Sequence, residues 1–248
     1  GVNDFSLSAG TYTADVAALA NVANAAGTEP VSGAGNVALT KLEDDLDADL
    51  SVITTTGTKT VAISGAQGVK SFTGDLGSGF TTSIGAGSTL STTATILDGQ
   101  TISGAGTVVV SGDLSNDLGV DLSAVTATGG ITATETAGGT FTAGSDLGAA
   151  TVTINAAGET VDLQAAGAGG VDASTFIVNA GTLVVTHAQM DAISNVGTIT
   201  GSAGNVTVIA GSDTATGVSA LLGDGNTQSS TALVKVEMSG TGTLTFDL

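Results

Sequence analysis

A short phrase recurs along this chain: an apolar residue, then Ser/Thr-Gly or Asn-Ala-Gly, then a strand-like segment. Its copies begin at Val31, Ile63, Ile102, Val178 and Ile199, with a looser copy at Met238. Self-similarity of this kind is typical of proteins that bury their core by stacking one structural unit on the next. The phrase therefore predicts a repeat architecture, which usually serves as a surface or a strut.

Longer repeats point the same way. Residues 32–63 and 103–131 each contain a strand, an acidic Leu-bearing segment, a Thr-rich turn and a second strand. The acidic segments end in the same tripeptide, Asp-Leu-Ser, at Asp49–Ser51 and at Asp121–Ser123. Residues 181–209 follow the scheme more loosely. We expect a single elongated repeat domain over residues 1–248, with degenerate units near 31–101, 102–177 and 178–248.

The composition favours a thin core. Hydrophobic residues make up 41% of the chain but aromatic residues only 3%, so small branched side chains must fill the interior. The 38 glycines lack the three-residue period of collagen and are best explained as turns between many short strands.

Strand signals dominate. Short Val-, Ile- and Thr-rich segments are bounded by Gly, Ala-Gly or Asn, and several alternate apolar with hydroxyl residues, as a strand with one buried face does. The predicted strands are Thr58–Ser64, Thr107–Ser111, Gly130–Thr136, Ala150–Asn155, Thr175–Asn179, Thr182–Thr186, Asn205–Ala210 and Leu233–Met238.

Three or four short helices are also expected. In Leu42–Leu50, leucines at i, i+4 and i+8 form one apolar stripe, and Thr40 with Glu43 matches a capping box. The other three predicted helices are Ala14–Ala26, Ala188–Ile193 and Ser219–Leu222.

These patterns predict an all-β fold, a parallel β-solenoid with short corner helices. The alternative is one or two β-sandwich domains, which also produce short strands and frequent turns. The solenoid is preferred because the phrase repeats and because the chain lacks the aromatic residues on which sandwich cores are usually centred.

The charge balance excludes several function classes. The chain has 23 acidic residues, four lysines and no arginine, giving a net charge of −19. Nucleic-acid binding needs cationic side chains to neutralise phosphates, so that partner is excluded, as is adsorption to an anionic membrane. No run of about twenty apolar residues is present, so we expect no membrane insertion. The chain begins at Gly1, from which we expect a processed product or an excised piece.

Acidic clusters are the candidate metal sites. The first contains Asp44, Asp45, Asp47 and Asp49, the second contains Asp113, Asp117 and Asp121, and a third turn contains Asp224. Calcium is the candidate ion, because it prefers several carboxylate oxygens. The alternative for the first cluster is the solvated face of a helix, and for the others ordinary surface turns. An EF-hand loop is excluded, because Leu50 and Thr56 stand where that loop needs Gly and Glu.

Signals for catalysis are absent, so we expect no enzymatic activity. The chain has no cysteine, which removes thiol catalysis and Cys-ligated zinc. His187 is the only histidine, and the sequence contains no nucleophile elbow whose serine it could activate. The glycine pairs lack the pattern of a phosphate-binding loop.

Three segments carry a family resemblance: Val184–Ser194, the following Gly197–Val206, and Val120–Thr126. In these, the chain resembles the Gly/Ala/Thr-rich strand-repeat regions of large exported bacterial surface proteins, namely S-layer proteins and RTX-type secreted adhesins. The resemblance implies β-solenoids or strings of β-sandwiches with structural or adhesive roles at the cell surface, often stiffened by Ca²⁺. The calcium-binding nonapeptide of RTX proteins does not recur in this chain.

The expected function is that of an extracellular structural protein. Strand-like sequence at Asp4–Ser8 and Thr243–Leu248 leaves edges that could template the next subunit, so that the chain would self-assemble into a surface layer or filament. One alternative is an adhesin segment that binds a glycan or host surface, and another is a solenoid enzyme acting on polysaccharide. The expected partners are further copies of the chain, with a glycan or cell surface as the second choice.

Overall fold

The computed structural model describes residues 5–18, 31–64, 68–172, 174–196, 199–201, 205–210 and 233–238. The chain divides into two compact units. The first comprises Gly1–Val109 and Ala124–Ile131, and the second comprises Val110–Ser123 and Thr132–Leu248. Each unit is built mainly of parallel β-strands.

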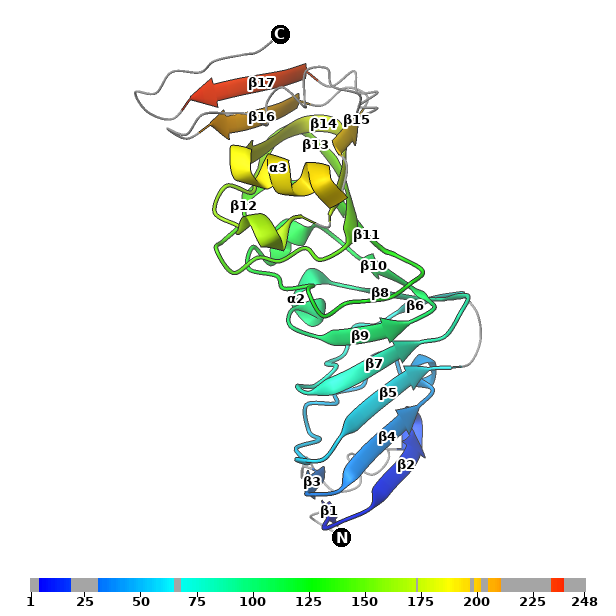
Figure 1. Cartoon of the computed structure of the whole chain (residues 1–248). Coiled ribbons are helices and arrows are strands. Elements are labelled where there is room, and N and C mark those ends of the chain that lie inside the picture. Colours follow the sequence, from blue (N-terminus) through cyan, green and yellow to red (C-terminus); the bar gives the residue numbers. More distant parts are fainter. Residues whose placement is uncertain are drawn as a thin grey trace. The chain divides into compact units, whose positions relative to one another are not determined.

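The first unit contains two main layers of strands (Figure 1). One sheet has the order β2-β4-β5-β7-β9, a second layer has the order β6-β8-β10, and β1 pairs with β3. The strands are β1 (Phe5–Leu7), β2 (Thr11–Asp15), β3 (Val31–Gly33), β4 (Asn36–Thr40), β5 (Lys59–Ile63), β6 (Gly68–Ser71), β7 (Phe80–Ile84), β8 (Ser88–Thr92), β9 (Thr101–Gly104) and β10 (Thr107–Val110). Two short helical turns lie between strands, the 3-10 turn η1 (Leu42–Asp44) and α2 (Ala94–Leu97).

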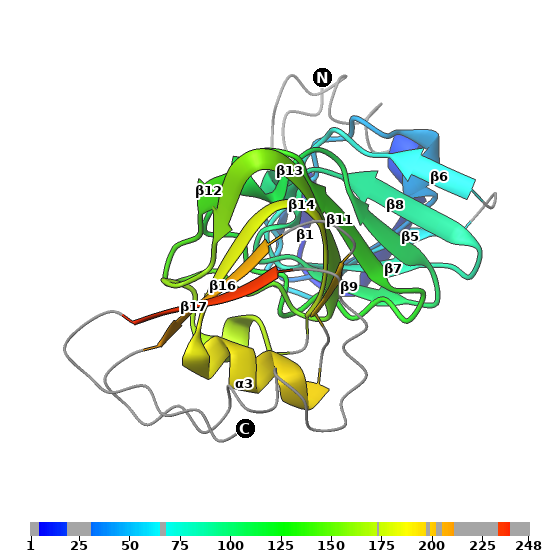
Figure 2. The ribbon, with the colours of Figure 1, turned by 90° about the horizontal axis from the view of Figure 1, so that it is seen from above.

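The second unit has the strand order β11-β13-β14-β16-β17, with β12 beside β13 and β15 beside β14. Its strands are β11 (Ile131–Glu135), β12 (Gly139–Thr140), β13 (Ala150–Asp162), β14 (Thr175–Thr186), β15 (Ile199–Gly201), β16 (Asn205–Ala210) and β17 (Leu233–Met238). The helical elements are η2 (Leu114–Asn116), η3 (Ala168–Gly170) and α3 (His187–Val196). Figure 2 shows that β13 and β14 curve together along their length.

A similar step along the sequence connects neighbouring strands. Every pairing whose register is described is parallel. The shortest step, 20 residues, occurs in both the β6–β8 and the β7–β9 pairing, and the longest, 28 residues, in the β16–β17 pairing. The long repeat in the sequence, from Asp49 to Asp121, therefore corresponds to about three structural steps. The predicted unit boundaries remain a prediction.

The core is made of columns of side chains at matching positions on successive strands. In the five-stranded sheet, one inward column contains Leu39, Val61, Thr82 and Ile102, all of them buried. The residues on either side of each point outward, which gives the period-two burial expected of a strand with one wet face. Burying each aliphatic side chain contributes roughly 1.5–3 kcal/mol, so a thin core still supplies most of the driving force.

The all-β prediction is confirmed: the molecule is mostly strand, with parallel sheets of many strands and few helices. The predicted strands correspond to β5, β10, β11, β13, β14, β16 and β17. The predicted strands Thr175–Asn179 and Thr182–Thr186 form the single strand β14.

The predicted helix Leu42–Leu50 is wrong. Only Leu42–Asp44 is helical, as a 3-10 turn, and Lys41 precedes it in the left-handed region (φ 56°) without a side-chain cap. Leu42 and Leu50 are buried as expected, but Leu46 is only half-buried and its carbonyl accepts a hydrogen bond from the Thr73 amide. The i, i+8 spacing is even, so it also fits the alternation of an extended chain.

Of the other three helix predictions, one is confirmed and two lie partly or wholly outside the described residues. The prediction Ala188–Ile193 is confirmed by α3, whereas α2, capped by the Thr93 hydroxyl, was not foreseen. In the predicted helix Ala14–Ala26, Ala14 and Asp15 belong to β2, residues 16–18 are helical and the rest lies outside the described residues. The prediction Ser219–Leu222 lies outside them too.

Glycines in the recurring phrase allow neighbouring strands to approach closely. Gly104 has φ 111°, and a Cβ there would lie 2.3 Å from the Ile84 carbonyl oxygen. Gly33 has φ 107° and the same 2.3 Å conflict with the Leu7 carbonyl oxygen. Positive φ and the missing side chain together explain why the phrase keeps Ser-Gly at both positions.

Gly104→Ala is expected to destabilise the first unit by at least about 2 kcal/mol, because strain at positive φ adds to a backbone clash. The matched control is Gly99→Ala, at φ 64° with no atom within 4 Å of the new Cβ, which should cost about 1 kcal/mol. Urea unfolding of both variants measures the difference. Equal losses of unfolding free energy in the two variants would show that the backbone clash at Gly104 adds no cost to the strain of positive φ.

Thr82→Val is expected to stabilise the first unit by about 1 kcal/mol. The Thr82 hydroxyl is fully buried and has no hydrogen-bond partner among the described residues, so its desolvation is uncompensated. Thr81→Val on the outward side of the same strand is the control and should change stability by less than about 0.5 kcal/mol. A Thr82→Val protein that melts at a lower temperature would contradict this account.

Candidate functional site

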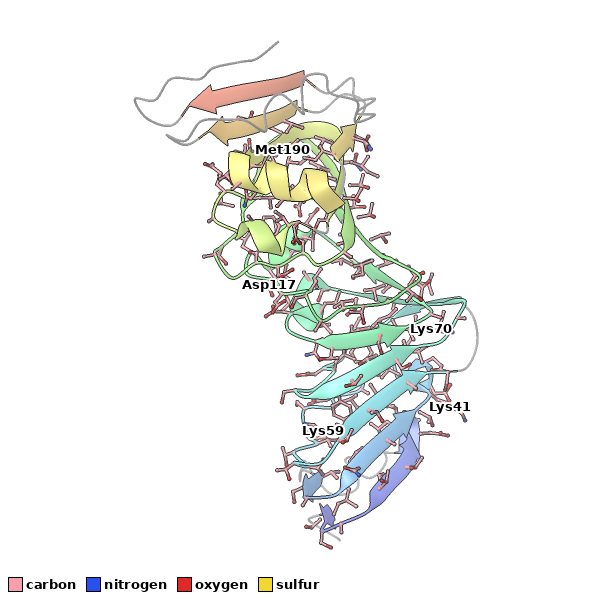
Figure 3. The ribbon with its side chains drawn as sticks, in the orientation of Figure 1. Lys41, Lys59, Lys70, Asp117 and Met190 are labelled. Atoms are coloured by element: carbon pink, nitrogen blue, oxygen red, sulfur yellow. The ribbon has the colours of Figure 1, made fainter. Side chains whose placement is uncertain are left out.

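The two described acidic clusters occupy equivalent local structures. Each is built around a 3-10 turn that begins with a buried leucine, Leu42 in η1 and Leu114 in η2. Each ends at an Asp-Leu-Ser whose leucine, Leu50 or Leu122, is fully buried. The predicted acidic residues lie along these segments, including Asp117, labelled in Figure 3. Asp224 lies outside the described residues.

The Asp-Leu step is a turn motif. The Oδ1 atom of Asp49 accepts a hydrogen bond from the Ser51 amide, and that of Asp121 accepts one from the Ser123 amide, both at 2.9 Å. The buried leucine between each pair anchors the turn to the core. These carboxylates thus satisfy backbone donors that would otherwise lack a partner.

The same motif occurs at Asp75, Asp146 and Asp162, which the sequence analysis did not identify, and at Asp117, which it identified only as a candidate metal residue. Asp75, Asp146 and Asp162 accept from the amide two residues on at 2.7, 2.8 and 2.9 Å, and Asp117 does so at 3.3 Å. The leucines that follow the first three are buried. The recurring dipeptide Asp-Leu was the available signal, but only its Asp-Leu-Ser copies were recognised as equivalent.

Two pairs of these aspartates stand directly beside one another. Asp49 pairs with Asp75 and Asp121 with Asp146 in parallel bridges. The backbone bonds on either side are short, for example 2.7 Å from the Leu122 amide to the Asp146 carbonyl oxygen. Like charges in register repel, so each carboxylate is held there by its own turn hydrogen bond and not by its neighbour.

These arrangements do not form a metal cage in the described part of the chain. There, no group of three or more His, Cys, Asp or Glu side chains is placed to hold a metal ion. The aspartates of the two clusters lie along the turns, and Asp49, Asp113, Asp117 and Asp121 accept from backbone amides. Calcium binding therefore stays a prediction for the whole predicted set.

Asp45 is the acidic residue of the first cluster whose titration is displaced. Partial burial raises its pKa, and the hydrogen bond to Asp47 and the charge of that residue raise it further. In the second cluster the corresponding residues are Asp117 and Gly119, so this pairing is not repeated.

A second kind of carboxylate contact joins each 3-10 turn to the end of a strand. In the first unit, Glu43 in η1 accepts from the Ser64 amide at 3.3 Å. In the second unit, Asp113 accepts from the amide and hydroxyl of Thr136. Ser64 directly follows β5 and Thr136 directly follows β11, so the two contacts occupy the same place in the repeat.

Glu135 is a candidate functional residue that the sequence analysis did not identify. It is completely buried on β11, where its carboxylate accepts from the amide and hydroxyl of Ser115. Burial raises its pKa, and the nearby Asp113 charge adds to that effect against the lowering by the Ser115 hydrogen bonds. An acidic residue at an inward position of an alternating strand was the available signal. Its burial excludes direct contact with a substrate.

The described lysines have different surroundings (Figure 3). Lys41 forms an ion pair with Asp15 at 3.1 Å, and Lys59 donates to the Ile53 and Ser78 carbonyl oxygens and lies 5.4 Å from the Phe80 ring centroid. Lys70 lies on β6 beside Val69, the one exposed large hydrophobic residue in the described part of the chain. The side chain of His187 lies outside the described positions.

Comparisons with known proteins identify no relative: no protein-family model, curated protein or solved structure matches this chain. Across the residues that the structure describes, no helix is long and apolar enough to cross a membrane.

Asp121→Ala is expected to destabilise the second unit by about 1 kcal/mol, because the Ser123 amide loses its acceptor. Glu159→Ala, an exposed residue on β13 of the same unit and outside the predicted metal set, serves as the control and should stay within about 0.5 kcal/mol of the parent. Thermal unfolding with chelator and with Ca²⁺ measures both. A Ca²⁺ stabilisation lost in Asp121→Ala would instead identify a metal role for this carboxylate.

Proposed function

We propose that the chain is an extracellular structural protein that self-assembles through strand edges into a surface layer or filament. In this proposal, each unit consists of successive turns of a parallel β-solenoid. The observation that carries the proposal is the parallel pairing of successive strands in register, each strand of the five-stranded sheet coming 20 to 25 residues after its partner. A stack of this kind has no intrinsic end, because each strand offers the next one the same row of backbone donors and acceptors.

The edges of the five-stranded sheet differ from one another. Within the described residues, β2 pairs with β4 alone, which makes it the terminal strand of this sheet. At the opposite edge, β9 is covered by residues 124–126, since Ile102 exchanges hydrogen bonds with Ala124 and Thr126. A second copy of the chain is the occupant we propose for the β2 edge, in a head-to-tail contact that propagates without closing.

The charge of the chain fits this function. With a net charge of −19, copies repel one another wherever acidic surfaces meet, so lateral bundling is opposed while backbone pairing at an edge is not. Divalent cations would relieve the repulsion and promote the association of filaments into layers. Location at a bacterial cell surface is part of the proposal and rests on the compositional resemblance.

An adhesin is the second candidate, and a specific feature favours it. One outward column of the five-stranded sheet runs Thr13, Ala38, Thr60, Thr81 and Thr101, a row of hydroxyl and methyl groups without charge. Hydroxyl-rich surfaces exchange hydrogen bonds with sugars readily. Polysaccharide cleavage is the third candidate.

Purified chain is expected to form fibres or sheets, visible by negative-stain microscopy and light scattering, more extensively in millimolar Ca²⁺ than in chelator. Thr13→Lys, on the terminal β2 strand, should reduce assembly because an edge lysine disfavours strand addition. Thr101→Lys, in the same column on the covered β9 strand, is the matched control and should assemble like the parent.

Each outcome has a distinct meaning. Assembly unaffected by either substitution would place the contact elsewhere than β2. A stable monomer with and without Ca²⁺ would overturn self-assembly, and binding to a glycan array would then support the adhesin.

A further inference from the structure

A reciprocal pair of carboxylate contacts joins η2 to the end of β11. Glu135 on β11 accepts from the Ser115 amide at 3.0 Å and from the Ser115 hydroxyl at 2.6 Å. In return, Asp113, at the start of η2, accepts from the amide and hydroxyl of Thr136. Each segment therefore supplies one carboxylate and receives one.

The two carboxylates differ in their access to water. Glu135 has no exposed surface, whereas Asp113 is partly exposed. In the first unit the corresponding inward position holds Ile63, and the contact depends on a single carboxylate, that of Glu43. The second unit has thus placed a titratable group where the first has a hydrocarbon.

We propose that Glu135 makes the η2–β11 contact an acid-tightened latch, which holds residues 112–119 against β11 when Glu135 is protonated and loosens as that carboxyl ionises. The neutral carboxyl can still donate to or accept from the Ser115 hydroxyl, so protonation keeps the hydrogen bond while removing a buried charge. Ionisation leaves that charge buried beside a second carboxylate, Asp113.

The charge of Asp113 opposes the ionisation of Glu135. The other titratable residues on the adjoining segments are Asp117 on the η2 side and Glu159 and Asp162 on β13, which neighbours β11. The strand β10, which precedes η2 in the sequence, carries no titratable residue, and none of these segments carries a lysine. The latch therefore has no cation on these segments to offset ionisation of Glu135.

The direction with pH follows from linkage. Burial raises the pKa of Glu135 above its ordinary 4.5, so its contribution to stability is fully present below pH 4.5 and is lost as pH rises through the raised value. The second unit should thus lose stability on going from mildly acidic to neutral pH through this residue, whereas most carboxylates give the opposite dependence.

The test is hydrogen exchange of the full chain, with protection factors for residues 112–119 and 131–136 compared between pH 4.5 and pH 8. In the parent, protection should fall several-fold with pH, and Glu135→Gln, which keeps both hydrogen bonds without the charge, should abolish the fall. Glu159→Gln, an exposed glutamate on the neighbouring strand, should leave the fall intact.

A pH dependence in Glu135→Gln equal to that of the parent would overturn the latch. If Glu135→Gln does not fold, the carboxyl carbon of Glu135 can be titrated by NMR in the parent chain. A midpoint above 4.5 would support the proposal, and a midpoint at or below 4.5 would overturn it. The outcome is independent of whether copies assemble, because the latch lies within one unit.

Discussion

The parallel backbone ladder is the constraint on which the other features depend. Because each strand bonds in parallel to one that comes 20 to 28 residues later in the sequence, the chain must come back alongside an earlier strand, about 4.8 Å away, at each pairing. The returns bring backbone against backbone, which only glycine permits at Gly33 and Gly104. They also bring like residues into columns, so the core consists mainly of stacked aliphatic side chains, with four buried phenylalanines, Phe72, Phe80, Phe141 and Phe176, among them.

The turns between strands satisfy their backbone hydrogen-bond donors with side chains from the same turn. An aspartate binds the amide two residues ahead, and the leucine between them is buried, so one tripeptide both satisfies a donor and anchors the turn. Many of the acidic side chains in the described part of the chain thus have a structural role in turns. The carboxylates that join η1 and η2 to strand ends extend the same principle over a full step of the ladder.

Much of the fold could be predicted from the sequence, because β-branched segments between glycines determine strands directly, as β16 and β17 show. The segment from Leu42 to Leu50 could not be, since its leucine spacing fits helix and extended chain equally, and pairing with Thr73 decides between them. Within the candidate site, Asp49 and Asp121 were found because Asp-Leu-Ser repeats. Glu135 was missed because its burial depends on Ser115, which belongs to the preceding step of the ladder.

The unequal step length has an evolutionary consequence. Register is fixed inside the short strands, where inserting one residue would exchange the buried and exposed faces, whereas the long pair β13–β14 shifts its register near Asn155. Between the strands, the step already varies in length, from the short Thr81–Thr101 pairing to the longer Asn205–Leu233 pairing, and the strands stay parallel throughout. Such a molecule can acquire or discard loop residues, and with them surface chemistry, while its interior stays the same. Sequence differences among descendants of such a protein would therefore be concentrated at the turns, and the strand sequences would change least.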